Sequence, residues 1–234
     1  MRWRAVIAGP VVISLAFVAC GDDRAATTTT TTTSPAFTPQ QLSEALLTTS
    51  DLGGLGIVWT ETQRDVFATR EPENPSIDPS LWCPAGKGDE LVALAGGEGA
   101  DVELMSGSSE SPYIVRQQAW TNADVERYFA SVKGAVDACS GVTWTDDGGN
   151  SYTLAPSATV PAIGDDSVSW RVTIELTGAT PSMSFTDQTA SRFGDVMMVL
   201  QGGATPTTGP DASGPNYVLV ARSAGDKMAG LVTP

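Results

Sequence analysis

Short segments that alternate apolar and polar residues fill the second half of the chain, and they restrict the fold more than any other feature. The clearest is residues 167–176, where Val168, Trp170, Val172, Ile174 and Leu176 fall on one side of an extended chain. The segments expected to be strands are residues 142–145, 151–154, 167–176, 183–192 and 193–200. The loops between them are too short for the crossovers that parallel strands need. The pattern therefore predicts a mostly antiparallel sheet.

Helical spacing marks other parts of the chain. From Thr121, the residues Thr-Asn-Ala-Asp suit an N-cap followed by an acid, and a helix over residues 122–138 follows. Its apolar stripe consists of Val125, Tyr128, Phe129, Val132, Ala135, Val136 and Cys139. A closing helix is expected over 216–231, with Tyr217, Val220, Ala221, Ala224, Met228 and Leu231 on one face.

The first half is expected to hold a helix at 39–48 capped by Thr38, a strand at 57–67 and a short helix within 81–94. Further strands are expected at 101–105 and 113–120, and loops at 70–79 and 202–215. Together these elements predict one α+β domain over about residues 36–232.

The first twenty residues indicate export. Arg2 and Arg4 precede an apolar stretch, 5–18, which is shorter than the roughly 20 residues needed to span a bilayer. This arrangement is typical of a secretory signal peptide. A polar segment with seven consecutive threonines, Thr27 to Thr33, follows; it cannot bury a core and is expected to be a disordered tether. Such a tract also suits O-glycosylation, although an inert spacer would have the same composition.

The end of the signal segment, Phe17-Val18-Ala19-Cys20, resembles a bacterial lipobox. The resemblance implies that residues 1–19 are removed, that the Cys20 thiol is diacylated and that the new amino terminus is acylated. Two or more acyl chains hold a protein stably on a membrane. Residues 20–35 would then be the lipidated cysteine and its tether. The alternative is an ordinary secretory signal that ends near a cysteine.

Two cysteines remain, Cys83 and Cys139. Disulfides persist in exported proteins, and two leftover cysteines most simply pair with each other. Cys139 lies on the apolar stripe of its helix, so a bond would attach that helix to the segment Trp82-Cys83. Two buried thiols are the alternative.

Composition excludes several functions. The net charge of −14 argues against nucleic-acid binding and against charge-driven binding to anionic membranes. The chain has no histidine, which removes the Ser-His-Asp triad and His-ligated metal sites. No nucleophile motif, phosphate-binding loop or dinucleotide motif is present. We expect no catalytic residue, no metal and no cofactor.

The candidate ligand-binding residues are Trp82, Arg116 and Arg171. Trp82 lies in a Pro-bounded segment beside the expected disulfide, whereas the other tryptophans on strands are more typical of a core. Arg116 and Arg171 lie on expected strands of an acidic chain and could hold an anion, or could be surface arginines with paired charges. Asp165-Asp166 could supply a carboxylate for glycoside hydrolysis, which needs a second carboxylate nearby. The run 146–150 could suggest calcium, but a hairpin turn explains it.

A resemblance connects several of these segments. They are residues 46–52, Trp82-Cys83, the helix that ends at Cys139, residues 161–167 and residues 194–200. Together they resemble the PknH-like extracellular domain family of actinobacteria, found as the sensor domain of a receptor serine/threonine kinase and in free-standing lipoproteins. The resemblance implies a twisted antiparallel sheet flanked by helices, with a cleft as a ligand site. The kinase sensor domain has two disulfides, whereas this chain can form one.

The sequence therefore predicts a lipoprotein on the extracytoplasmic face of the cell membrane. Its domain would bind an envelope ligand or an envelope protein without catalysis, in a cleft between the sheet and a helix that the 202–215 loop could cover. The alternatives are a hydrolase of envelope glycans that uses carboxylates alone, and a structural envelope protein.

Overall fold

An eight-stranded sheet organises the described part of the chain, with the strand order β1-β2-β3-β8-β7-β6-β5-β4. The computed structural model describes residues 37–68, 81–94, 97–108, 111–121, 124–157, 159–177, 182–207 and 216–232. The expected signal peptide and tether, 1–35, lie outside these residues. The strands are β1 (Trp59–Phe67), β2 (Glu98–Ser108), β3 (Ser111–Thr121), β4 (Thr143–Thr145), β5 (Ser151–Pro156), β6 (Asp166–Leu176), β7 (Ser182–Phe193) and β8 (Val196–Thr207).

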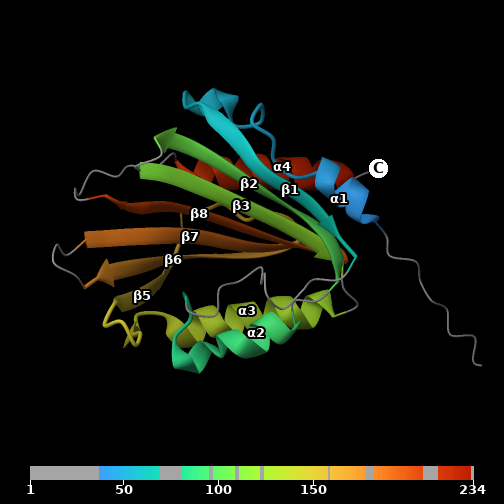
Figure 1. Ribbon diagram of the computed structural model, residues 1–234. Coiled ribbons are helices and arrows are strands. Elements are labelled where there is room, and N and C mark those ends of the chain that lie inside the picture. The colour runs from blue at the N-terminus through green and yellow to red at the C-terminus, as the bar shows by residue number, and fades with distance from the viewer. Residues whose placement is uncertain are drawn as a thin grey trace, which may run out of the picture. The chain divides into compact units, whose positions relative to one another are not determined.

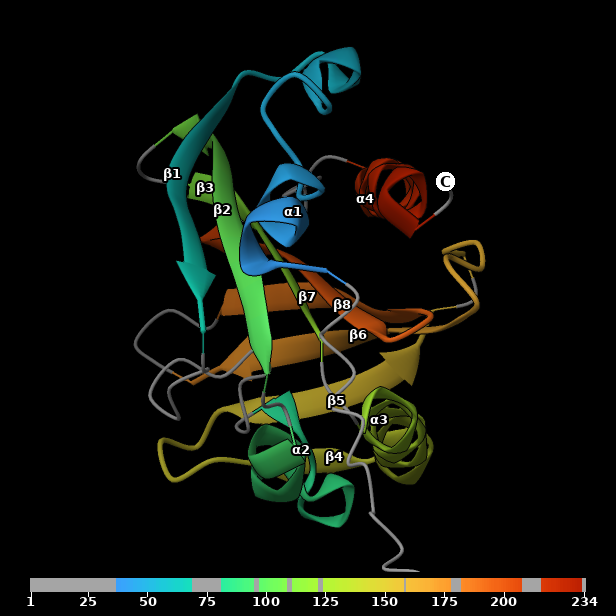
Figure 2. The same ribbon diagram turned by 90° about the vertical axis from the view of Figure 1, so that its right-hand side faces the viewer.

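Every neighbouring pair of strands is antiparallel, which confirms the predicted α+β class. The helices are α1 (Pro39–Glu44), α2 (Gly88–Leu94), α3 (Val125–Cys139) and α4 (Tyr217–Val232), with short 3₁₀ turns at Gly53–Leu55 and Pro84–Gly86. Strands β3 and β8 pair in the middle of the sheet, so the two halves of the sequence meet there. Figure 2 shows the strong twist between β1–β3 and β5–β8.

Helices cover the sheet on both faces, and each face has its own core (Figures 1 and 2). On the α1–α4 face, Leu42 and Val220 from the helices pack with Val115 and Leu200 from β3 and β8. On the α2–α3 face, the buried residues include Leu91 of α2, Val132 of α3, and Trp120, Trp170 and Val199 of the sheet. Side chains alternate between the two faces along each strand, so neighbours in sequence enter different cores.

The helices agree with their apolar patterns but not at every end. All seven residues of the predicted stripe on α3 are buried. The helix begins at Val125 rather than Asn122, because Thr121 is the last residue of β3, and its N-cap is Asp124 without a side-chain cap bond. Thr38 caps α1 as expected, in a capping box with Gln41.

Helix α1 ends at Glu44 instead of continuing to residue 48. Arg64 of β1 donates hydrogen bonds to the carbonyls of Ser43 (2.7 Å) and Leu47 (2.6 Å). In a continued helix the Leu47 N–H would donate to the Ser43 carbonyl, but it donates to Gln117 Oε1 instead. The Arg64 side chain thus supplies hydrogen bonds to the segment where the predicted helix would have had its last turn.

Strand β8 runs to Thr207, so the prediction of a loop from residue 202 is wrong for its first part. Gly202 shows the reason. A Cβ on this residue would lie 2.5 Å from the Tyr113 hydroxyl and 2.8 Å from the Tyr217 ring. Gly202 is therefore a position of close packing within the sheet, although the Gly-, Pro- and Thr-rich segment that it begins has the composition of a loop. Residues 208–215 lie outside the described residues.

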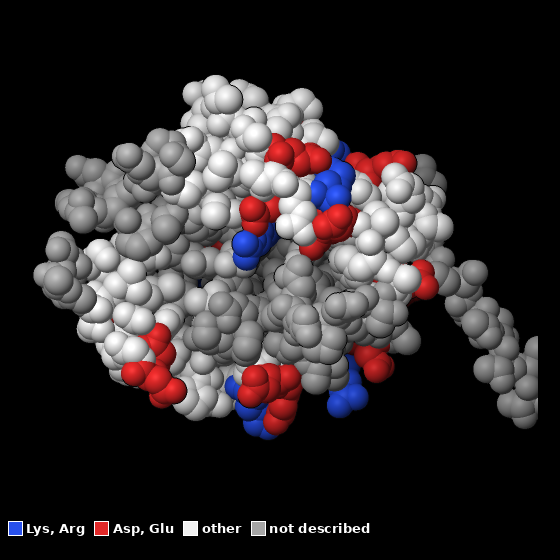
Figure 3. All heavy atoms as spheres, viewed as in Figure 1, with Lys and Arg blue, Asp and Glu red and all other residues white. Residues whose placement is uncertain are grey.

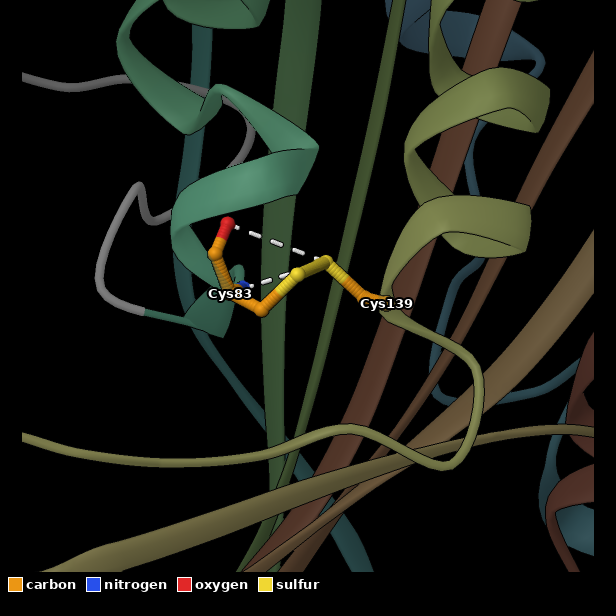
Figure 4. Close-up of a disulfide and its surroundings, with 2 residues drawn as sticks. All are labelled: Cys83 and Cys139. Atoms are coloured by element: carbon orange, nitrogen blue, oxygen red, sulfur yellow. Dashed lines mark hydrogen bonds between the residues drawn. A yellow bond between two sulfur atoms is a disulfide. The ribbon is translucent and has the colours of Figure 1, made fainter.

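The predicted disulfide between Cys83 and Cys139 is present, with a Cα–Cα distance of 5.5 Å (Figure 4). Both residues are buried, and the backbone N–H of Cys83 also points at Cys139 Sγ at 3.2 Å. The bond attaches the C-terminal end of α3 to the segment before α2.

Candidate functional site

Trp82 belongs to the core and not to an exposed ligand site. Its side chain is 4% exposed, and its ring lies 5.2 Å from the ring of Trp170 between centroids. Trp59, Trp120 and Trp170 are buried as well. Trp144 is half-buried and stacks on Tyr152. Among the described residues, no row of exposed aromatic rings is available to stack on a ligand, which corrects the expectation for Trp82.

Arg116 lies on the α2–α3 face of β3 and forms an ion pair across the sheet. Its Nε donates to Glu103 Oε2 at 2.6 Å, and its side chain is 58% exposed. Thr62 Oγ1 donates to the other carboxylate oxygen of Glu103 at 2.9 Å. Burial alone would raise the pKa of Glu103, but the hydrogen bonds from Arg116 and Thr62 and the charge of Arg116 outweigh it and hold the pKa below its ordinary value. The pair is thus charged and electrically neutral as a unit.

Two buried glutamines lie on the same face. Gln118 of β3 is 7% exposed and Gln188 of β7 is 2% exposed. The Oε1 of Gln118 and the Nε2 of Gln188 are buried and have no hydrogen-bond partner. Buried polar atoms in native proteins are nearly always paired, so each exception calls for a cause such as a water or a ligand.

The strand registers place these groups close together. Arg116 pairs with Gln201 of β8, and Gln201 pairs with Gln188 of β7, so these three form one row across the sheet. Gln118 lies two residues further along β3 on the same face. From strand spacing and rise, the Cα atoms of Gln118 and Gln188 are about 12 Å apart. We refer to Arg116, Gln118, Gln188 and Gln201 as the glutamine surface.

The face of the molecule toward the viewer in Figure 3 carries charges of both signs in adjacent pairs. Arg64 with Glu61, at 2.8 Å, and Lys87 with Glu90, at 3.1 Å, are further ion pairs of the described residues. The excess of acidic residues thus coexists with local neutralisation of the basic side chains.

Arg171 occupies the opposite face of the sheet. Its Nε and Nη2 each donate to Asp187 at 2.7 Å, and its guanidinium lies 4.6 Å from the centre of the Phe185 ring. Asp187 is 5% exposed at its side chain, whereas Arg171 is 50% exposed. The hydrogen bond with Asp187 raises the pKa of Arg171, with desolvation opposing it.

Tyr113 and Tyr217 lie near this pair on the same face. Burial raises the pKa of the Tyr113 phenol, and the charge of Asp187 raises it further. The Tyr217 hydroxyl makes hydrogen bonds with Thr189 Oγ1 and the Leu200 carbonyl, each at 3.0 Å. The Tyr113 hydroxyl is buried without a partner.

The structure therefore separates the three candidate ligand residues. Arg116 and Arg171 are on opposite faces, and Trp82 is buried in the core of the α2–α3 face. Each arginine is engaged by a carboxylate, as the alternative of paired arginines anticipated.

The other acidic candidates have local structural partners. Asp165 Oδ2 accepts from the backbone N–H of Gly194 at 2.6 Å, and Asp166 lies 3.6 Å from Lys133 Nζ. Asp146 accepts from the Asn150 backbone and side chain, which closes the hairpin turn as predicted. Within the described ranges, no group of three His, Cys, Asp or Glu side chains could hold a metal ion.

A pocket of about 290 Å³ lies between α2 and α3. Its lining residues are Ala85, Gly86, Lys87, Glu90, Leu91, Ser131, Gly134 and Ala135. A Cβ on Gly86 would lie 2.6 Å from Cys139 Sγ, so this glycine lets the chain pass directly over the disulfide. No helix in the part of the chain that the structure describes is long and apolar enough to cross a membrane.

Comparison with solved structures gives one likeness of fold. The chain is similar to the crystal structure of the extracellular domain of PknH from Mycobacterium tuberculosis, with a TM-score of 0.47 and 17% identity. The similarity covers 85% of this chain and 96% of that one. No model of a protein family and no curated protein matches the chain.

Gln118, Gln188 and Asp187 are not among the residues predicted from the sequence. A signal was present, because Gln117-Gln118 and Asp187-Gln188 each put two polar residues in the middle of a strand. In a strand with one face exposed to solvent, only one of two consecutive polar residues would be buried. The covered faces of this sheet bury all four residues.

Proposed function

We propose that the chain is an exported, lipid-anchored protein whose domain binds a ligand at the glutamine surface and does not convert it. One observation carries the binding role. The buried Oε1 of Gln118 and Nε2 of Gln188 lack partners on one face of the sheet. Leaving such atoms unpaired costs about 1–3 kcal/mol each, and a bound molecule that pairs them removes this cost.

The chemical groups of the glutamine surface suit the binding of a ligand better than catalysis. Side-chain amides stay neutral at ordinary pH, so Gln118, Gln188 and Gln201 can orient a ligand but cannot serve as acid or base. Glu103 is held in its charged form by two donors, Arg116 and Thr62. A reaction would need a base with a pKa near the working pH.

The anchor is supported by the order of segments along the chain. A signal-like stretch, Cys20 and a polar tether precede Thr38, where the first capped helix begins. The fourteen residues from Gly21 to Ser34 reach at most about 50 Å when extended. This length is enough to hold the domain clear of a membrane.

Native mass spectrometry of the full chain, purified in detergent from its own membranes, tests the binding role. The wild-type protein should carry an added mass of a small molecule. The double variant Gln118→Met, Gln188→Met should lose it, because methionine keeps the shape of glutamine without its hydrogen bonds. Gln63→Met is the matched control, since Gln63 is an exposed glutamine of the sheet edge that bonds to Asp65. An added mass that persists in the double variant, or none in the wild type, contradicts the proposal.

A further inference from the structure

We infer that two copies of the chain pair their β1 strands, antiparallel and around a two-fold axis, to form one continuous sheet. The axis passes between Thr62 and Gln63, so that Thr62 of one copy lies opposite Gln63 of the other. The β1 edge is separate from the glutamine surface, and the association needs no ligand. Three features support it: the open edge at β1, a bulge in that strand and the charges beside the bulge.

Strand β1 is the longer of the two edge strands of the sheet. It has 9 residues, whereas β4 at the other edge has 3. Within the part of the chain that the structure describes, β1 pairs with β2 alone, and no strand lies on its outer side (Figure 2). The outer N–H and C=O groups of such a strand can pair with a further strand. Val58 and Val66 add apolar surface at its two ends, since their exposed fractions are 85% and 51%.

A bulge interrupts the alternation of side chains in the middle of β1. Thr62 is the extra residue, because the register with β2 passes directly from Glu61 to Gln63. Thr62 Oγ1 donates to Glu103 at 2.9 Å and Gln63 pairs with Glu103, so both side chains lie on the α2–α3 face. Glu61 and Arg64, on either side of them, form an ion pair on the α1–α4 face. The two faces are thus occupied in the same order when β1 is read in either direction from the point between Thr62 and Gln63.

This symmetry selects one register for a second copy. The further pairs across the axis are Glu61 with Arg64, Thr60 with Asp65 and Trp59 with Val66, and each pair joins side chains of one face. A shift by one residue would set side chains of opposite faces against each other along both arms of the strand. Bulges and charges commonly protect an edge from pairing. Here the bulge is placed so that a copy of the same strand fits, and the two-fold pairing closes as a dimer.

The charges beside the bulge are complementary in this register. Glu61 and Arg64 lie 2.8 Å apart within one chain, and each would also face the opposite charge of the second copy. The two ion pairs would then form a ring of four alternating charges. Opposite charges directly across a pair of strands stabilise it, and like charges there destabilise it. At the ends of the strand, the exposed Val66 would pack beside Trp59 of the second copy and lose contact with water.

The helices leave room for the second copy. Helix α1 packs mainly on β2 and not at the edge. With two β1 strands between them, the β2 strands of the two copies would lie about 14 Å apart. Packed helices need about 8–10 Å between their axes. The two α1 helices therefore fit side by side on one face of the joined sheet.

A cysteine placed at the axis tests the pairing. In this register the Cα atoms of Gln63 in the two copies are about 6 Å apart, which a disulfide can span. The full-length variant Gln63→Cys, oxidised in its own membranes with copper phenanthroline, should give a covalent dimer of twice the chain mass on non-reducing gels. Thr145→Cys is the matched control, because Thr145 is an exposed threonine of β4 at the other edge, and this variant should stay monomeric. Absence of the Gln63→Cys dimer, or equal amounts of dimer from both variants, contradicts the inference.

Two substitutions of the exposed Thr60 test the register. Thr60→Glu would place a carboxylate against Asp65 of the second copy at two points around the axis. The dimer Kd of the full chain, measured by sedimentation equilibrium in detergent, should then rise about tenfold. Thr60→Lys places the opposite charge against the same aspartate, so its Kd should stay the same or fall. A wild-type chain that is monomeric at every concentration, a Kd that Thr60→Glu leaves unchanged, or equal effects of the two variants would each show the inference to be wrong.

Discussion

Gln117 and Gln118 are neighbours in sequence, and their contrast makes a sharp test of the binding argument. Both are buried, but they point into different faces of the sheet. Gln117 accepts a hydrogen bond from the backbone N–H of Leu47 at 2.7 Å and donates to Met198 Sδ at 3.2 Å. The Oε1 of Gln118 has no partner. Substitution by methionine removes the amide from each with little change of shape.

The two substitutions should have opposite effects on the free energy of unfolding. Gln117→Met leaves the Leu47 N–H buried without an acceptor, which costs about 1–3 kcal/mol. Gln118→Met removes an atom that is already unpaired, so stability should stay the same or rise by about 1 kcal/mol. For a domain of this size, each kcal/mol corresponds to about 2–4 °C in Tm. The Tm of Gln117→Met should therefore fall by about 2–12 °C.

Thermal unfolding followed by circular dichroism, with urea unfolding as a second measure, separates the two cases. The ligand must first be removed, because a bound molecule stabilises the native state. If Gln118→Met lowers stability as much as Gln117→Met, then Gln118 has a structural partner. Such a result would contradict a ligand at this position.

Three further predictions follow from the disulfide, the anchor and the acidic groups. Cys83→Ala with Cys139→Ala should lower the free energy of unfolding by about 4 kcal/mol, because the bond closes a loop between cysteines 56 positions apart in sequence. Urea unfolding with and without reductant measures this, and an unchanged midpoint contradicts it. Cys20→Ser should release the protein from membranes or leave it unprocessed, and incorporation of a fatty-acid analogue that survives the substitution would refute the anchor. The folded-state pKa values of Asp51, Glu61 and Glu103 lie below their ordinary values, so the stability they contribute is complete above the unfolded values of 3.8 for Asp and 4.5 for Glu and is lost as pH falls through the folded ones. Urea midpoints should therefore decrease below about pH 4.5, and Glu103→Gln should make that decrease smaller.

The alternating pattern predicted most of the fold because each strand follows a local rule. On β6, Trp170 and Val172 are fully buried on one face and Val168 and Ile174 pack beside them, as the period of two indicates. The stripe on α3 and the disulfide followed from the same kind of spacing. The end of α1 and the length of β8 could not be predicted in this way. They depend on Arg64 reaching across to carbonyls of another element, and on Gly202 making room for two tyrosines distant in sequence.

The candidate site was predicted less well, because charge and aromatic character in a sequence do not show which groups are already paired. Arg116 and Arg171 are the conspicuous residues, and both turn out to be neutralised by carboxylates. Trp82 is conspicuous and is buried. The glutamines carry neither charge nor ring. Their unpaired atoms become visible only when the register of β3, β8 and β7 brings them onto one face.

Why a sheet would retain such glutamines can be argued from their position. Both positions could be apolar, since Val199 pairs with Gln118 and Ala190 lies two residues from Gln188 on β7, in the same core. Leucine or methionine at 118 and 188 would extend that core and remove two unpaired atoms. Because such changes commonly stabilise a fold at the cost of function, the two amides are best explained by a bound molecule that completes their hydrogen bonds. Apolar substitutions at positions 118 and 188 should therefore raise the free energy of unfolding and weaken ligand binding at the same time. At Gln117, whose bonds are complete within the protein, stability alone should fall.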